Sequence, residues 1–263
     1  HLKYVLDFSG KLQKSNGKGY SPKAILENQV NDNARPEKDF LKTLPESGLC
    51  RKVIASVRPL DKTILPRAVT KMDNKTKPLG ALGRLEDLGI RMSMIQNSLS
   101  PKIRQKNIFV FAGDHGVAEE GVSAFPAEVT GQMVDNFLNG GAAINVLCRH
   151  HNIHLKVVDM GVIKDFSPHP NLINAKVARG TKNFALQNAM TRNELVLALE
   201  NGMQAFLDAH KTEPIDIVGL GEMGIGNTTS ASAIICAVTG IGPAQSAGPG
   251  TGVDNTGLAH KIQ

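Results

Sequence analysis

The sequence predicts an α/β fold in which a parallel β-sheet is flanked by helices, in a Rossmann-like arrangement. Two observations support this class. From residue 107 onward, apolar segments of strand length alternate with segments of helical periodicity, which is the order that builds parallel sheets with right-handed crossovers. The apolar segments are also continuous, as at residues 108–112, and this is typical of strands that are buried on both faces.

The composition is that of a globular protein. The 263 residues are 41% hydrophobic and 21% charged, with a formal net charge of +6, which excludes a chain that is disordered throughout. The longest apolar stretch, residues 231–238, is shorter than the roughly 20 residues of a membrane span, so no membrane partner is expected. The three cysteines lie far apart without a C-x-x-C pair. We therefore expect no disulfide framework, no structural zinc site and a cytoplasmic location.

Positive charge is concentrated in the first part of the chain, where residues 1–106 carry 21 Lys and Arg against 10 Asp and Glu. We expect a basic, poorly ordered leader at 1–52, a helical segment at 53–106 and the α/β domain at 107–263. No Arg-rich block accompanies the lysines, so no nucleic-acid partner is expected. The chain begins at His1 without a methionine and ends inside a predicted helix, and we expect it to be a piece of a longer protein.

The individual elements follow from periodicity and end signals. A helix is predicted from about Arg84, because apolar residues follow at helical spacing up to Ile95. The pair Thr191 and Glu194 is a capping box that predicts the start of a helix reaching about Ala209. The remaining elements are expected in chain order as strands at 108–112, 155–160 and 215–220, and helices at 126–138, 142–149 and 228–238.

The segment 218–229 is the richest in functional signals. A predicted strand runs into Gly219, Gly221, Gly224 and Gly226, and then Asn227, Thr228 and Thr229 open a helix. Glycines let a ligand approach the backbone, and free N–H groups at a helix N-terminus attract phosphate. With Asn227 as the N-cap, the segment predicts a phosphate or ribose site, and a purely structural turn is the alternative. A dinucleotide site is not favoured, because no acidic residue follows at the required distance of about 20 residues.

Two further groups of residues are candidates for a site. Asp114 and His115 follow the strand at 108–112, at the rim where α/β sheets place ligands. Because neighbouring side chains of an extended segment point to opposite faces, we expect them to orient a loop or substrate, with no metal bound. Phe125, Met133 and Met223 are candidates to enclose a flat aromatic ring, and core packing is the alternative.

Five segments in this order and spacing resemble the nicotinate-nucleotide–dimethylbenzimidazole phosphoribosyltransferases of cobalamin lower-ligand synthesis. The resemblance covers about residues 53–263. The matching segments are residues 77–86, 113–117, 120–126, 136–146 and 221–229. The resemblance implies transfer of 5-phosphoribose from nicotinate mononucleotide to 5,6-dimethylbenzimidazole, giving α-ribazole 5′-phosphate and nicotinate, without a cofactor. It also implies a smaller helical domain formed from the chain ends, and a homodimer.

Site residues carry over by position. The loop of Glu222, Gly224, Gly226, Asn227 and Thr228 is expected to hold the nucleotide. Lys261, which follows a glycine-rich loop at 248–252, is expected to approach its phosphate. Phe125, Met133 and Met223 are expected to border the benzimidazole, with Asp114 and His115 on the same rim.

The general base of the family is a glutamate near the family's C-terminus, beyond Gln263. Glu222 is the carboxylate of this chain that the matched motif places beside the reacting atoms, and it is expected to be a weak substitute. We therefore expect little activity from these 263 residues alone. The alternative is a non-catalytic protein that binds the nucleotide or ribazole. The preferred base stays open, with adenine, phenols and other benzimidazoles as further candidates.

Overall fold

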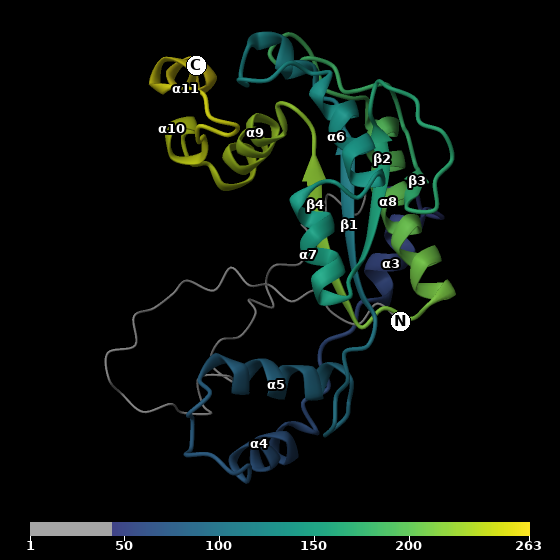
Figure 1. Ribbon diagram of the computed structural model, residues 1–263, viewed down its shortest axis with the longest axis vertical. Helices are drawn as coiled ribbons and strands as arrows, with labels where there is room; N and C mark the ends of the chain where they lie inside the picture. Colours follow the sequence, from purple (N-terminus) through teal and green to yellow (C-terminus); the bar gives the residue numbers. More distant parts are fainter. Residues whose placement is uncertain (1–43) are drawn as a thin grey trace. The chain divides into compact units, whose positions relative to one another are not determined.

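A computed structural model describes residues 44–263 (Figure 1). Residues 1–43 of the expected basic leader lie outside the described residues. The chain divides into two compact units between Lys102 and Ile103, whereas the sequence predicts a domain boundary between residues 106 and 107. In the first unit the described elements are three helices: α3 (Leu49–Ser56), α4 (Leu65–Asp73) and α5 (Arg84–Ile95).

Helical structure in the first unit begins at an earlier residue than the sequence predicts, and fewer of the apolar residues of α5 are buried than expected. Helix α3 begins at Leu49, four residues before Val53 and so within the expected leader, and Cys50 is buried in it. Helix α5 begins at Arg84, as predicted. Of its apolar residues, Ile90 and Met94 are buried, but Leu85 is 65% exposed. The buried face of α5 is completed by Glu86, whose carboxylate pairs with Lys77 at 2.9 Å.

The second unit is built on a four-stranded parallel sheet in the order β3-β2-β1-β4. Its strands are β1 (Lys106–Gly113), β2 (His154–Gly161), β3 (Leu172–Asn174) and β4 (Ile217–Met223). The predicted α/β class with a parallel sheet is therefore confirmed. Strand β3 is absent from the sequence-based expectations, because three residues are too short for a period-two pattern.

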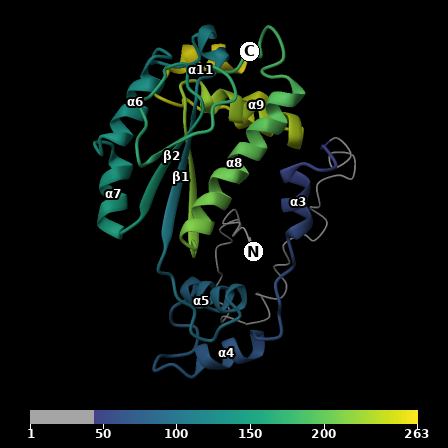
Figure 2. The same ribbon diagram turned by 90° about the vertical axis from the view of Figure 1, so that its right-hand side faces the viewer.

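Helices cover both faces of this sheet (Figure 2). Helices α6 (Val129–Leu138) and α7 (Ala143–His151) lie on one side and α8 (Arg192–Thr212) on the other. Successive residues of β1 alternate between the two faces. Ala112 accordingly packs in a core with Val134 of α6, whereas Phe109 packs with Ala205 of α8.

The chain after β4 continues through helices α9 (Asn227–Thr239), α10 (Pro243–Ser246) and α11 (Asn255–Ile262), and a 3-10 helix (Gly116–Glu120) follows β1. Because parallel strands all end at one edge, the segments after β1, β2 and β4 meet there. That edge carries most of the candidate residues. Within residues 44–263, no helix combines the length and the apolar character of a membrane span.

Candidate functional site

A cavity of about 410 Å³ opens at the carboxyl edge of the sheet. Its walls come from the ends of β1, β2 and β4, from the loop at 177–182, and from the first turns of α8. The walls are mainly apolar, with Phe111, Met160, Met190 and Met223 as their large side chains. The polar groups among its lining residues are Asp114, His115, Arg179, Thr181, Lys182, Glu194 and Glu222.

Glu222 reaches this cavity from β4, where it lies opposite Phe111 of β1 in the parallel register. Burial raises the pKa of the Glu222 carboxyl above its ordinary value, because the charged form loses hydration. Glu194 also lines the cavity, but its carboxylate accepts hydrogen bonds from the Thr191 N–H at 2.7 Å and the Thr191 hydroxyl at 2.8 Å. Glu194 therefore caps α8, while Glu222 is available to act as a proton acceptor.

Asp114 is fixed at the end of β1 by the loop that follows β2. The Ile163 N–H donates to Asp114 Oδ2 at 2.7 Å, and the Asp114 N–H donates to the Gly161 carbonyl at 3.0 Å. The residue is 7% exposed, and its Oδ1 has no hydrogen-bond partner within the described part of the chain. A buried carboxylate oxygen without a partner is costly, so this atom is a natural acceptor for a ligand or a water molecule.

His115 also lines the cavity and contacts α9. Its Nδ1 lies 3.0 Å from the Ser230 hydroxyl of α9. Burial lowers the pKa of His115, and the negative charge of Asp114 opposes that effect only in part. At neutral pH the imidazole is therefore uncharged, and its link to Ser230 joins the end of β1 to α9.

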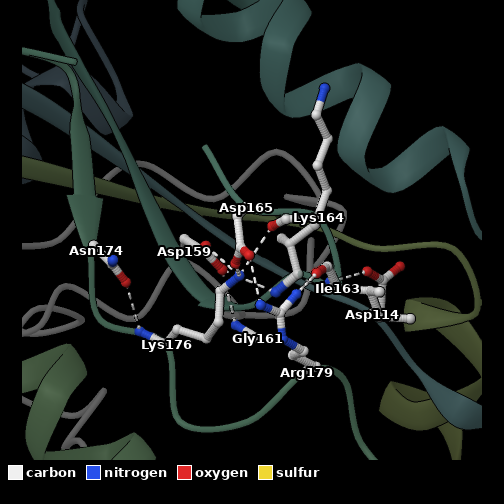
Figure 3. Close-up of polar contacts among 10 residues, drawn as sticks. Asp114, Asp159, Gly161, Ile163, Lys164, Asp165, Asn174, Lys176 and Arg179 are labelled. Atoms are coloured by element: carbon white, nitrogen blue, oxygen red, sulfur yellow. Dashed lines mark hydrogen bonds and ion pairs between the residues drawn. The ribbon is translucent and has the colours of Figure 1, made fainter. Parts of the chain in front are cut away.

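A polar network supports the loop that holds Asp114 (Figure 3). The buried Asp159 of β2 accepts hydrogen bonds from the N–H groups of Gly161 at 3.1 Å and Val162 at 2.9 Å. Its other carboxylate oxygen lies 3.3 Å from the ammonium of Lys176. That ammonium also donates to the Lys164 carbonyl at 2.9 Å. The loop that follows β2 is thus bound by Asp159 at its start and by Lys176 at Lys164.

The glycine-rich loop after β4 is constrained by close contacts. A Cβ atom on Gly224 would lie 2.1 Å from the Gly113 carbonyl oxygen and 2.9 Å from His115 Nε2, so only glycine fits there. Gly226 has a φ of +89° and is the N-cap of α9. The prediction that Asn227 is the N-cap is wrong. Asn227 is the first residue of the helix, and its Oδ1 accepts from the Thr228 N–H at 2.7 Å.

Lys261 forms a second cluster with Thr228. The Lys261 ammonium donates to the Thr228 hydroxyl at 2.9 Å and to the Gly248 carbonyl at 3.1 Å. Lys261 is 9% exposed, and burial lowers its pKa because the charged form is poorly hydrated. The structure therefore brings together Lys261 and Thr228, which the sequence predicts separately as nucleotide or phosphate contacts, and places Lys261 against the loop at 248–252.

The structure separates the other expected residues. Asp114, His115, Glu222 and Met223 line the cavity. Phe125 is 52% exposed and Met133 lies in α6, and neither lines it. The expected ring sandwich of Phe125, Met133 and Met223 thus has one member in this cavity and stays a prediction. No three or more His, Cys, Asp or Glu side chains gather as metal ligands anywhere in the described ranges.

Arg179 and Lys182, both cavity-lining, are missing from the sequence-based expectations. They belong to a loop without regular elements between β3 and α8. No motif or periodicity marks them. A basic residue in a loop is usually solvated, so the sequence alone gives no reason to place either residue in a site. Their role depends on where the loop is held in three dimensions.

Comparison with known proteins places the second unit and the end of the first in one family. A family model described as "Phosphoribosyltransferase" matches residues 57–263. Nicotinate-nucleotide–dimethylbenzimidazole phosphoribosyltransferases from Citrifermentans bemidjiense and Geobacter sp. (strain M21) are 52% and 51% identical over 215 residues, covering 82% of this chain. The chain spans 61% of the length of each of these relatives.

A solved structure gives the same relationship. The crystal structure of CobT from Thermus thermophilus matches with a TM-score of 0.73 and 43% identity, over 76% of this chain and 60% of that chain.

Proposed function

The chain belongs to the nicotinate-nucleotide–dimethylbenzimidazole phosphoribosyltransferase family, and on that premise we propose that it transfers 5-phosphoribose from nicotinate mononucleotide to 5,6-dimethylbenzimidazole. The products are α-ribazole 5′-phosphate and nicotinate, in the assembly of the lower ligand of cobalamin. The observation that carries the proposal is the apolar cavity at the carboxyl edge of the sheet, with Glu222 in its wall.

The reaction involves departure of the leaving group, attack by the acceptor, removal of a proton and alignment of the two substrates, and the site must support each of these. Nicotinate leaves the anomeric carbon while positive charge develops on the ribose ring. A nitrogen of the benzimidazole attacks from the opposite face, which inverts the β linkage to α. A carboxylate accepts the proton from the second ring nitrogen. The donor and the acceptor must also be held in line, and fixed contacts supply that orientation.

The residues suit these tasks in two groups. Met160, Met190, Met223 and Phe111 offer flat apolar contact for an aromatic ring. Glu222 has a raised pKa, which makes it a better proton acceptor near neutral pH than an ordinary carboxylate. Its negative charge also favours the developing positive charge on the ribose. In this proposal Glu222 acts as the base.

The phosphate is assigned to the second cluster. The ammonium of Lys261 beside the Thr228 hydroxyl, at 2.9 Å, offers a charge and a donor to a phosphate oxygen. Gly224, Gly226 and Asn227 precede Thr228 in the same glycine-rich segment and are assigned to the backbone contacts with the nucleotide. Phosphate binding would restore charge balance around a buried ammonium whose pKa is lowered by desolvation.

The partners follow from the same proposal. The small-molecule substrates are nicotinate mononucleotide and a benzimidazole base, and the assembly is a homodimer in the cytoplasm. The alternative, a non-catalytic binding protein, is not favoured, since relatives at 50% identity and above carry the name of the transferase.

The test is product formation. The protein is mixed with nicotinate mononucleotide and 5,6-dimethylbenzimidazole, and α-ribazole 5′-phosphate is measured by mass spectrometry. Product supports the transferase. Nucleotide binding without product would favour the non-catalytic alternative.

A further inference from the structure

Arg179 belongs to the loop at 177–182 and lines the cavity. Its guanidinium contacts two neighbouring residues, and these contacts do not use all of its N–H donors. One guanidinium nitrogen donates to the Ile163 carbonyl at 2.6 Å, and another lies 2.5 Å from the Asp165 carboxylate (Figure 3). The side chain is nevertheless 60% exposed and lines the cavity. A guanidinium has five N–H donors, so these two contacts leave donors for a ligand.

The position of the guanidinium is fixed by a chain of ionic contacts that ends in the core. Asp165 also pairs with Lys176 at 3.1 Å, and Lys176 pairs in turn with Asp159, which is 2% exposed. Hydrogen bonds from Arg179 and Lys176 hold the pKa of Asp165 below its ordinary value. Asp165 therefore keeps its charge at neutral pH and remains an ionic partner for Arg179.

The chemistry around Arg179 suits a flat ring that carries an anionic group. The cavity walls nearest in sequence to Arg179 are the small residues Val177, Ala178 and Gly180. Met160 and Met190 add flat apolar surface. Lys182 adds a second positive charge to the same loop. An anion without a ring would leave the apolar walls in contact with water, and a neutral ring would gain nothing from the guanidinium charge.

We propose that Arg179 binds the carboxylate of the nicotinate ring and thereby selects a nicotinate-bearing donor over its nicotinamide counterpart. This inference rests on the proposed function, which supplies the donor. The donor has two anionic groups, a carboxylate and a phosphate. Lys261 and Thr228 form the second cationic cluster and take the phosphate. The planar fork of a guanidinium matches a planar carboxylate through paired hydrogen bonds.

The test compares Arg179→Ala and Arg179→Lys with the unaltered protein. The dissociation constants of free nicotinate and free nicotinamide are measured by calorimetry. The unaltered protein is expected to prefer nicotinate by about 10- to 100-fold, the range of a charge-assisted hydrogen-bond pair. Arg179→Ala is expected to abolish that preference by weakening nicotinate binding alone. Arg179→Lys should retain part of it, because the charge remains without the fork.

Arg104→Ala is the matched control. Arg104 is exposed just before β1, at the opposite end of the strand from the cavity, so the same loss of charge there should leave the preference unchanged. Unchanged nicotinamide binding in Arg179→Ala shows that the cavity stays intact. A protein that binds both rings equally, or an Arg179→Ala variant that keeps the preference, would overturn the proposal.

Turnover separates this inference from the proposed function. Rates are measured with nicotinate mononucleotide and with nicotinamide mononucleotide as donors. If neither donor gives product with the unaltered protein, the proposed function fails, and the binding constants still decide the role of Arg179. If Arg179→Ala weakens both nucleotides alike while free nicotinate binds as before, Arg179 serves the phosphate and the proposal is wrong.

Discussion

Gly224 and Glu222 lie two residues apart and are constrained for different reasons. The backbone at Gly224 passes so close to the Gly113 carbonyl that a side chain has no space. Glu222 has space in the cavity, but it loses part of its hydration there, which raises its pKa. Packing thus limits the side chain that Gly224 can carry, whereas desolvation changes the pKa of Glu222. A different substitution tests each effect.

Replacing Gly224 with Ala should destabilise the protein. The added Cβ would lie 2.1 Å from a backbone oxygen that cannot move aside cheaply, so we expect a loss of about 1–3 kcal/mol in the free energy of unfolding. Urea denaturation measures it. Gly242→Ala is the control, because its Cβ would meet no atom within 4 Å. Equal midpoints for the two variants would show that the loop relaxes freely and would contradict this argument.

Replacing Glu222 with Gln should change the dependence of stability on pH. The pKa of Glu222 is raised in the folded protein, so its favourable contribution is complete below its ordinary value of 4.5. The contribution is lost as the pH rises through the folded pKa. The Gln variant does not ionise and avoids this loss. Relative to the unaltered protein, it should therefore become more stable as the pH rises from 4.5 through the folded pKa, measured by urea denaturation at several pH values.

The exposed Glu128, replaced by Gln, serves as the control for this pH series. A Glu222→Gln variant whose stability follows the unaltered protein at every pH would argue against desolvation of that carboxyl. The same variant should lose turnover by about 100- to 10,000-fold if Glu222 accepts the proton. Retained turnover with altered pH dependence of stability would separate burial from catalysis.

At the scale of an element, α8 links local sequence to the site. Its start is fixed by the capping box of Thr191 and Glu194, in which the Glu194 N–H donates to the Thr191 hydroxyl at 3.3 Å. Its first turns bring Glu194 and Ala198 to the cavity wall, and its middle packs Ala205 into the core against β1 and β2. A helix that begins one turn later would leave that wall open.

Thr191→Ala should cost about 1 kcal/mol of unfolding free energy, because it removes the acceptor for one otherwise unpaired N–H group. It should also weaken ligand binding in the cavity, since Glu194 loses the hydrogen bond from the Thr191 hydroxyl and keeps only the one from the Thr191 N–H. Thr212→Ala at the far end of α8 is the control. The Thr212 hydroxyl bonds back to the Asp208 carbonyl within an exposed turn, so its loss should have little effect. Chemical denaturation of both variants makes the comparison, and equal losses would refute a special role for the cap.

At the scale of the whole chain, the sheet is covered unevenly. Strand β4 is an edge strand, paired only with β1 in the described sheet. Leu220 lies on the same face of β4 as Glu222 and is 72% exposed, and α9 exposes Ile234 at 64% and Val238 at 79%. Exposed apolar edge strands favour association with another chain.

We therefore expect the 263-residue chain to associate as its concentration rises, and Leu220→Lys to reduce that association without lowering stability. Sedimentation velocity over a range of concentrations measures the first effect, and urea denaturation the second. Leu186→Lys is the control, since Leu186 is equally open at 76% exposure but lies in the loop before α8. If Leu186→Lys disperses the chain as well as Leu220→Lys does, the edge of β4 is not the cause.

Local patterns determined much of this protein. The apolar segments at 108–112, 155–160 and 215–220 correspond to β1, β2 and β4, and the capping box predicted the start of α8. Strand and helix periods, caps and glycine turns depend on neighbours in sequence, so the α/β class, the element order and the glycine-rich loop can be inferred from the residues alone.

Only the tertiary structure decided which candidates share a cavity. Asp114 is held by Ile163, 49 positions away, and Lys261 by Thr228, 33 positions away. It also left Phe125 and Met133 out of the cavity and brought Arg179 into it. The physical reason is that such contacts depend on the packing of segments far apart in the chain, which no local period records.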